Sequence, residues 1–236
     1  LEKAILLTDS RYIEAAQQKA EGVEVRLFDR ERPLAAQLYG ALREIDARKV
    51  AAEDQKLSHA GFLTWEKKLG FKLEGAGDLF TKLRAVKTEE EIASMIRAQR
   101  ISEKALEEVL PVIKPGMTER EVAAELVYRM LRNGSEGNSF DPIVVTGSKT
   151  SMPHGVPGDK VIQKGDFVTM DFGCLKDGYC SDMTRTVAVG SATDEMKNVY
   201  AVVLKAQLAG IAAAKAGVLG NDIDAAARKV IADAGY

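Results

Sequence analysis

Two aspartates, Asp171 and Asp182, flank a predicted β-hairpin and carry the kind of oxygen ligands that a divalent metal ion binds. The apolar run 167–170 predicts a strand that ends at Asp171, and the Asp177-Gly178 pair is a strong hairpin-turn signal. With the turn centred just before Asp177, the expected register places Asp171 directly opposite Asp182, on one face of the hairpin. Facing carboxylates repel each other, so a cation between them would make this arrangement favourable.

The carboxylate pair favours particular ions and also has a simpler explanation. Oxygen ligands suit Mn²⁺ and Co²⁺, and Mg²⁺ and Zn²⁺ are further candidates. The simpler explanation is a pair of solvated aspartates on an exposed hairpin, because aspartate is common near turns. Asp171 directly follows an apolar strand, which predicts buried surroundings and favours the metal site.

His154 is the third candidate for chemistry and lies in a predicted loop over residues 152–157. Two prolines and a glycine restrict the shape of this loop. An imidazole there could donate a hydrogen bond to a substrate carbonyl or transfer a proton near pH 7. The alternative is a structural or solvated loop residue. The other histidine, His59, has no acidic or cysteine companion and is predicted to be a surface residue.

The composition is that of a globular protein and excludes several functions. Hydrophobic residues make up 46% of the 236 residues and charged residues 29%, so a core can form without disulfides. A net charge of −2 argues against a nucleic-acid or acidic-membrane partner. No apolar run approaches the roughly 18 residues of a membrane span. Cys174 and Cys180 are expected to be unpaired, which suits a cytoplasmic location.

The elements that must position these residues fall into two predicted domains. Residues 1–82 alternate strand and helix patterns, which predicts an α/β domain with largely parallel strands. Its expected strands are 4–7, 23–28, 49–52 and 71–74, and its expected helices are 11–20, 33–45 and 58–69.

Residues 83–236 are expected to form an α+β domain. Two Thr-x-x-Glu capping boxes, at Thr88 and Thr118, predict helices that run to about residues 110 and 132. Strands are expected between about 140 and 189, followed by a helix over 194–216. Residues 114–134 have a weak echo 101 positions later. If the echo marks a repeat, the strands of a second half would need about fifty further residues after Tyr236.

With these motifs the sequence resembles the M24 metallopeptidases, in particular the Xaa-Pro aminopeptidase and Xaa-Pro dipeptidase (prolidase) branch. The resemblance covers nearly the whole chain and is most specific at the hairpin. It implies a creatinase/prolidase-type α/β domain followed by an α+β pita-bread catalytic domain. The segments that carry it are LTDSRY (7–12), LRAVKTEEEI (83–92), SFD (139–141), PHG (153–155), DFG (171–173) and SDMTRT (181–186).

The resemblance implies a role for each candidate residue. Asp171 and Asp182 would be the first two metal ligands, with Asp182 bridging two ions, and His154 would bind the substrate or stabilise the tetrahedral intermediate. Two divalent ions, Mn²⁺ or Co²⁺ with Zn²⁺ as an alternative, would hold a hydroxide that attacks the peptide carbonyl. Substrates would be peptides with proline in the second position. The enzyme would be a homodimer.

One departure from the family pattern concerns the ends of the chain. The family takes one histidine and two glutamates from its second half, and this sequence ends at Tyr236, before that segment. The family also has more N-terminal domain before Leu1. We therefore expect a chain truncated at both ends, with both domains incomplete and the second half lacking its strands. Two carboxylates alone would bind a metal weakly, so we expect this chain to be inactive by itself.

Two other functions stay open at this point. One is a catalytically inactive relative of the same fold that binds peptides or partner proteins. The other is a creatinase-like enzyme that hydrolyses a guanidino or amide metabolite without a metal. The presence of Asp171, Asp182 and His154 together argues against the first, and the aspartate pair argues against the second.

Overall fold

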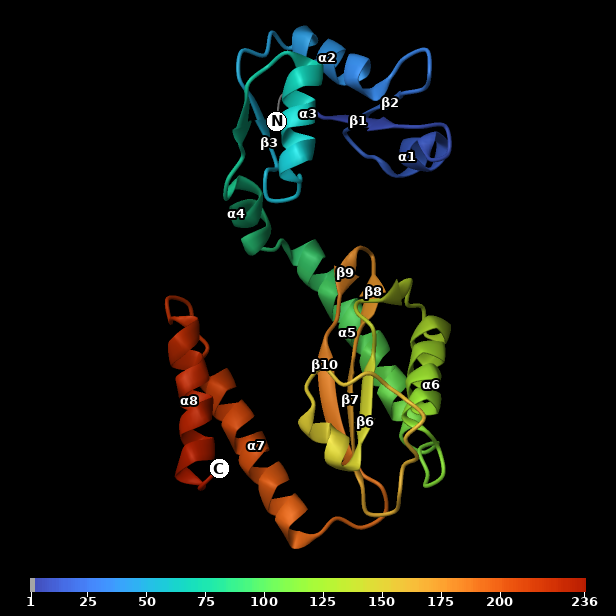
Figure 1. Cartoon of the computed structure of the whole chain (residues 1–236), viewed down its shortest axis with the longest axis vertical. Coiled ribbons are helices and arrows are strands. Elements are labelled where there is room, and N and C mark those ends of the chain that lie inside the picture. The colour runs from blue at the N-terminus through green and yellow to red at the C-terminus, as the bar shows by residue number, and fades with distance from the viewer. Residues whose placement is uncertain (1–2) are drawn as a thin grey trace. The chain divides into compact units, whose positions relative to one another are not determined.

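The computed structural model describes residues 3–236 and divides into two compact units, Leu1–Lys87 and Thr88–Tyr236 (Figure 1). The sequence predicts the division after residue 82. In the structure, helix α4 (Leu79–Ala85), which the sequence analysis did not predict, belongs to the first unit. The second unit begins at Thr88, the cap of the next helix.

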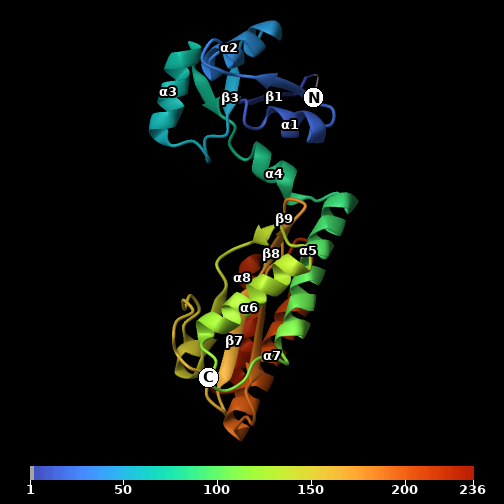
Figure 2. The same cartoon turned by 90° about the vertical axis from the view of Figure 1, so that its right-hand side faces the viewer.

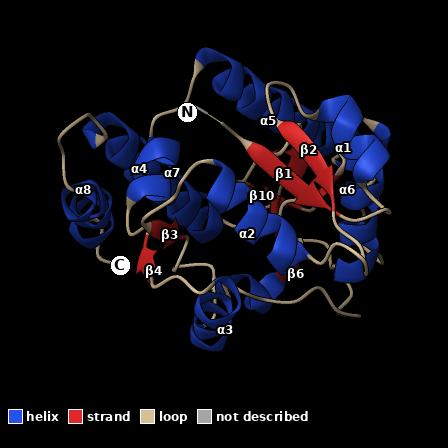
Figure 3. Ribbon diagram, turned by 90° about the horizontal axis from the view of Figure 1, so that it is seen from above, coloured by secondary structure: helices blue, strands red, loops and turns tan. Residues whose placement is uncertain are grey.

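The first unit alternates strands and helices, as predicted. β1 pairs in parallel with β2, and β3 in parallel with β4, so the described strands form two separate parallel pairs. Figure 3 shows β1 and β2 side by side. The elements before α4 are β1 (Ile5–Thr8), α1 (Ile13–Lys19), β2 (Glu24–Leu27), α2 (Leu34–Glu44), β3 (Val50–Ala52), α3 (His59–Leu69) and β4 (Leu73–Gly75).

Two capped helices, α5 (Glu89–Val109) and α6 (Glu119–Arg132), open the second unit. Both predicted capping boxes are confirmed. The Thr118 Oγ1 accepts a hydrogen bond from the backbone N–H of Glu121 at 3.2 Å, and the Glu121 carboxylate accepts one from the Thr118 N–H at 2.7 Å. Such a box satisfies backbone donors that the first helical turn leaves unpaired, and so sets where the helix begins.

The strands of the second unit form two small sheets. One has the order β10-β7-β6 and the other the order β5-β8-β9, and the strand pairs within both are antiparallel. The 3₁₀ helix η1 (Gly147–Ser151) follows β6 directly. The strands are β5 (Gly137–Asn138), β6 (Ile143–Thr146), β7 (Phe167–Phe172), β8 (Cys174–Lys176), β9 (Tyr179–Cys180) and β10 (Met183–Ala188).

Helices α5 and α6 pack on one face of the β10-β7-β6 sheet (Figures 1 and 2). Val168, Met170 and Phe172 of β7 are fully buried against this helical layer, which includes Leu126 and Met130 of α6. Fully burying a side chain of this size contributes about 1.5–3 kcal/mol. The alternate residues of β7 point to the other face of the sheet.

The predicted hairpin register was wrong by two residues. Lys176 pairs with Tyr179, so the turn residues are Asp177 and Gly178, whose φ angles are 52° and 77°. These are the positive angles of a two-residue turn, which the Asp-Gly pair favours. As a result Asp171 lies opposite Thr184, not opposite Asp182. The Asp-Gly pair does form the turn, but the centre of the turn lies one residue later than predicted.

Helices α7 (Asp194–Ala213) and α8 (Gly220–Asp233) close the described chain and pack against each other. α8 is 14 residues long, as is α6, and it begins and ends 101 positions after α6. The weak sequence echo therefore coincides with a repeated helix. None of the helices in residues 3–236 is long and apolar enough to cross a membrane.

Candidate functional site

The candidate site lies on the face of the β10-β7-β6 sheet that α5 and α6 do not cover. Asp171 is on the central strand, with Ile143 of β6 on one side and Thr184 of β10 on the other. Directly opposed residues share a sheet face. Thr169 lies two positions before Asp171 on β7 and shares its face. The hydroxyl of Thr169 is 2.9 Å from that of Thr186 on β10. This side of the sheet therefore carries two threonine hydroxyls near the aspartate, beside the apolar residues Ile143 and Val145 of β6.

Asp171 has a buried oxygen that its surroundings leave unsatisfied. The residue is half-buried, and its Oδ1 atom is inaccessible and has no hydrogen-bond partner among the described residues. A buried polar atom without a partner costs about 1–3 kcal/mol. Buried polar atoms without a hydrogen-bond partner are rare in proteins. Coordination of a metal ion is one physical reason for an atom to be left without one. The Asp171 Oδ1 therefore fits the role of a metal ligand.

Asp182 comes from the bend between the two small sheets. It lies between the buried residues Ser181 and Met183, and strand alternation places it on the same face as Thr184 and Asp171. Its side chain is exposed. The correction of the register by two residues keeps both aspartates on one face, although they are no longer directly opposed.

Serine hydroxyls, those of Ser102 and Ser181 buried and that of Ser139 half-buried, hold this bend in place. The Ser181 Oγ lies 2.7 Å from the Ser102 Oγ of α5 and accepts a hydrogen bond from the Cys174 N–H at 2.9 Å. The Ser139 hydroxyl donates to the Ser181 carbonyl at 2.8 Å. Gly173 permits the close approach, because a Cβ there would lie 1.9 Å from the Ser181 carbonyl oxygen. The backbone next to Asp182 is thus fixed from three sides.

The structure brings the His154 loop to the same face of the sheet. Gly155 is buried against Val145, so closely that an added Cβ would lie 2.6 Å from the Val145 Cγ1. Val145 pairs with Thr169, so its side chain shares the face of Asp171. His154 itself is exposed. All three predicted site residues therefore come from segments that border one sheet face.

A buried carboxylate that the sequence analysis missed holds this loop. Glu119, the first residue of α6, is fully buried and accepts hydrogen bonds from Thr146, Lys149 and Gly158. Acidic residues are common in the first turn of a helix, where they are usually exposed. The sequence therefore carried no signal that this glutamate would be buried.

The remaining candidates lie where the sequence analysis expected them. His59 begins α3 in the first unit and is exposed. Cys174 is buried, with its thiol 3.1 Å from the Ala98 carbonyl oxygen, and Cys180 is exposed, so the two are not paired.

The donor set fits part of a metal centre. Asp171 and Asp182 supply carboxylate oxygens on one face, of the kind that Mn²⁺, Co²⁺ and Mg²⁺ bind. Within residues 3–236, no group of three or more histidine, cysteine, aspartate and glutamate side chains is arranged to hold an ion. The two aspartates would therefore contribute two ligands, and full coordination needs donors in addition to them.

Family comparisons assign both units. The model of metallopeptidase family M24 matches residues 93–236. The model of the creatinase/prolidase N-terminal domain matches residues 1–86.

Comparison with individual proteins gives the same picture. The uncharacterized peptidase YqhT of Bacillus subtilis is 36% identical over 236 residues, all of this chain and 66% of YqhT. The solved Xaa-Pro dipeptidase from Bacillus anthracis matches all of this chain with a TM-score of 0.92 and 37% identity. The X-Pro aminopeptidase from Thermotoga maritima matches 98% of it with a TM-score of 0.92 and 38% identity. The chain spans 66% of each of these relatives.

Proposed function

The chain belongs to metallopeptidase family M24, and we propose that it provides the aspartate pair and the histidine loop of a metal-dependent peptidase acting on Xaa-Pro bonds. The observation that carries the proposal is the buried, unpartnered Oδ1 of Asp171 on the sheet face that the His154 loop borders. Two of the solved relatives, an Xaa-Pro dipeptidase and an X-Pro aminopeptidase, support proline next to the cleaved bond.

Each residue has a defined task in this proposal. Asp171 and Asp182 would hold the metal through their carboxylates, and the packed core behind β7 keeps Asp171 from moving away. A bound divalent cation polarises a carbonyl and lowers the pKa of water, which makes amide hydrolysis feasible near neutral pH. His154, exposed in its loop, would donate a hydrogen bond to the substrate carbonyl, where negative charge develops.

The metal identity, the assembly and the location belong to the same proposal. Carboxylate ligands support Mn²⁺ or Co²⁺ as the ions, with Zn²⁺ as an alternative. The free thiols of Cys174 and Cys180 are consistent with the reducing cytoplasm. The homodimer that the family resemblance implies stays a prediction, which the molar mass in solution tests.

The chain by itself is proposed to be inactive. Two carboxylates give a metal few ligands, and the described residues contain no group of three or more potential ligands. The test is Mn²⁺-dependent hydrolysis of an Xaa-Pro peptide by this chain and by the complete product of its gene.

The expected result is turnover by the complete gene product that falls to background in both Asp171→Asn and Asp182→Asn. If the isolated 236-residue chain turns over the peptide and the same variants abolish this activity, the proposal that the chain alone is inactive is wrong. The proposed metal-dependent peptidase activity would then be supported. If neither preparation turns over any Xaa-Pro peptide, the peptidase proposal fails and a peptide-binding module is favoured.

A further inference from the structure

We propose that Glu119 is a positioning residue, whose buried carboxylate fixes the loop 147–158 and thereby holds His154 over the sheet face of Asp171. The inference rests on the proposed function, because Glu119 acts on the reaction only through His154. It concerns a residue that lies on a different element from all three predicted site residues.

Glu119 joins the two ends of the loop through its two carboxylate oxygens. Oε1 accepts a hydrogen bond from the backbone N–H of Thr146, just before the loop, at 2.9 Å. Oε2 accepts one from the N–H of Gly158, at the end of the loop, at 3.0 Å. Gly158 is held a second time, because its carbonyl accepts from the Arg120 N–H at 3.0 Å. One side chain therefore closes a segment of twelve residues onto the first turn of α6.

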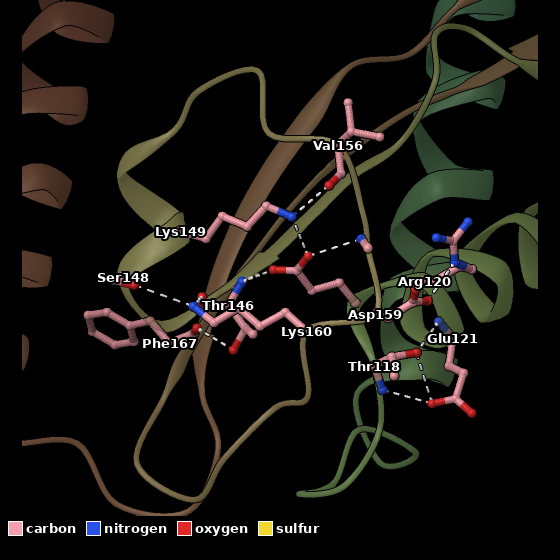
Figure 4. A network of polar contacts seen from close by, with 12 residues as sticks. Thr118, Arg120, Glu121, Thr146, Ser148, Lys149, Val156, Asp159, Lys160 and Phe167 are labelled. Carbon is pink, nitrogen blue, oxygen red and sulfur yellow. Dashed lines mark hydrogen bonds and ion pairs between the residues drawn. The ribbon is translucent and has the colours of Figure 1, made fainter.

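Lys149 extends this contact into the loop. Its Nζ donates to the Glu119 Oε2 at 2.6 Å and to the carbonyl of Val156, two residues after His154, at 2.7 Å. Figure 4 shows the Lys149 side chain reaching the Val156 carbonyl. The ammonium group therefore connects η1, which precedes His154, with the segment that follows it. Hydrogen bonds between charged partners are about twice as strong as neutral ones.

The loop has little apolar packing to hold it otherwise. The two large apolar side chains on either side of His154, Met152 and Val156, are 53% and 77% exposed. The buried contact next to His154 is made by Gly155, which has no side chain. A second polar tie, from the Lys160 Nζ to the Thr146 carbonyl at 2.7 Å, also joins the loop ends. Polar contacts, with Glu119 at their centre, therefore set the position of His154.

A role in positioning explains why a charge is buried here. A buried ion pair contributes little to stability compared with apolar residues of the same volume, because both charges lose their hydration. Glu119 is fully buried, whereas the Lys149 side chain is 24% exposed. The Glu119 carboxylate does fix the orientation of the loop, since it accepts hydrogen bonds from Thr146, just before the loop, and from Lys149 and Gly158 within it. The start of α6 also favours a negative charge at this position.

The test uses Glu119→Gln, which keeps the shape of the side chain but removes its charge and one acceptor. The control is Asp159→Asn, the same change one residue after the loop, where the carboxylate is 85% exposed and pairs with Arg120. Hydrogen exchange and histidine NMR are measured on the metal-free chain. The chain has two histidines, so the His59 resonance, from the other unit, is an internal reference.

We expect exchange of the amides in 147–158 to rise about tenfold in Glu119→Gln, because two of its anchoring acceptors are weakened. The His154 resonance should shift while that of His59 stays unchanged. Asp159→Asn should change neither signal. If Glu119→Gln does not fold, Lys149→Met, which leaves the two backbone bonds to Glu119 intact, is measured in its place. Unchanged loop exchange and an unchanged His154 resonance overturn the proposal.

Activity of the complete gene product separates positioning from a general structural effect. If Glu119 acts through His154, Glu119→Gln lowers kcat in the parent and has no further effect in a His154→Ala background. Equal losses of kcat in both backgrounds overturn the positioning role. If the parent hydrolyses no Xaa-Pro peptide, the proposed function fails, and the exchange and NMR data alone decide whether Glu119 fixes the loop.

Discussion

Gly173 and Ser181 lie so close together across the bent hairpin that a Cβ on Gly173 would be 1.9 Å from the Ser181 carbonyl oxygen. The nearest obstructing atom belongs to the backbone, so moving a side chain aside would not relieve the clash. The contact lies between Asp171 and Asp182 along the hairpin. A change in this backbone contact would therefore move the two proposed metal ligands relative to each other.

The first prediction follows from this contact. Gly173→Ala should destabilise the second unit by about 3 kcal/mol, because overpacking here forces the backbone apart. The measurement is urea unfolding followed by circular dichroism. Gly137→Ala in β5 is the matched control, since a Cβ there meets no atom within 4 Å. Equal stability of the two variants would contradict the close approach.

The second prediction concerns Asp171 and the metal. Without metal, Asp171→Asn should be at least as stable as the parent, because it removes the charge of a half-buried carboxylate whose inaccessible Oδ1 has no partner among the described residues. In the complete gene product, Mn²⁺ should raise the melting temperature of the parent and not that of the variant, since only binding to the native state stabilises it. Calorimetry with and without EDTA measures both effects, and Asp159→Asn, at an exposed carboxylate, is the control. Equal stabilisation of Asp171→Asn by Mn²⁺ would exclude Asp171 as a ligand.

A third prediction addresses the contact between Gly155 and Val145. Gly155→Ala places a Cβ 2.6 Å from the Val145 Cγ1, so the loop must lift from the sheet. We expect a loss of about 1–3 kcal/mol and a shifted His154 resonance. Val145→Ala in the same chain removes the clashing methyl group and should restore the resonance. If the double variant stays as perturbed as the single one, the contact does not place His154.

The fourth prediction is a pH dependence of the first unit. Hydrogen bonds from Arg26 and then from Lys3 lower the pKa of Glu44 from 4.5 to about 2. A lowered pKa stabilises the folded state above the unfolded pKa of 4.5, and this contribution is lost as pH falls toward 2. Glu44→Gln should therefore be less stable than the parent at pH 6 and equally stable near pH 2. The effect should be small and weaken with salt, because the ion pairs are at the surface.

The fluorescence of Trp65, the single tryptophan, measures this unit alone because it lies in α3. Glu21→Gln is the control, at an exposed position for which no ion pair is found among residues 3–236. A difference between Glu44→Gln and the parent that persists unchanged down to pH 2 would contradict the assignment.

Local signals predicted most elements of the fold. The capping boxes at Thr88 and Thr118 correctly placed α5 and α6, and the alternation of strands and helices correctly gave the parallel pairs of the first unit. The predicted fold class, a creatinase/prolidase-type domain followed by a pita-bread catalytic domain, is confirmed by the family matches and the solved relatives. These signals work because each acts within a few residues of the chain.

Longer-range features of the candidate site could not be predicted in the same way. The pairing of Asp171 with Thr184 depends on which two residues occupy the turn, and an error of one residue there moves every partner by two. The burial of Glu119 depends on a loop about thirty residues later, which periodicity does not detect. The contact between Gly155 and Val145 is likewise visible only once the loop has folded over the sheet.

Strand β7 also restricts how this family can evolve. Its even-numbered residues build the core and its odd-numbered residues line the site, so one inserted or deleted residue would exchange the two sets. Such a single-residue change in β7 would therefore disrupt both the packing of the core and the candidate site. The turn at Asp177-Gly178 belongs to the other small sheet, beyond the bend. Lineages of this protein should therefore accumulate length changes at that turn while β7 keeps a constant length.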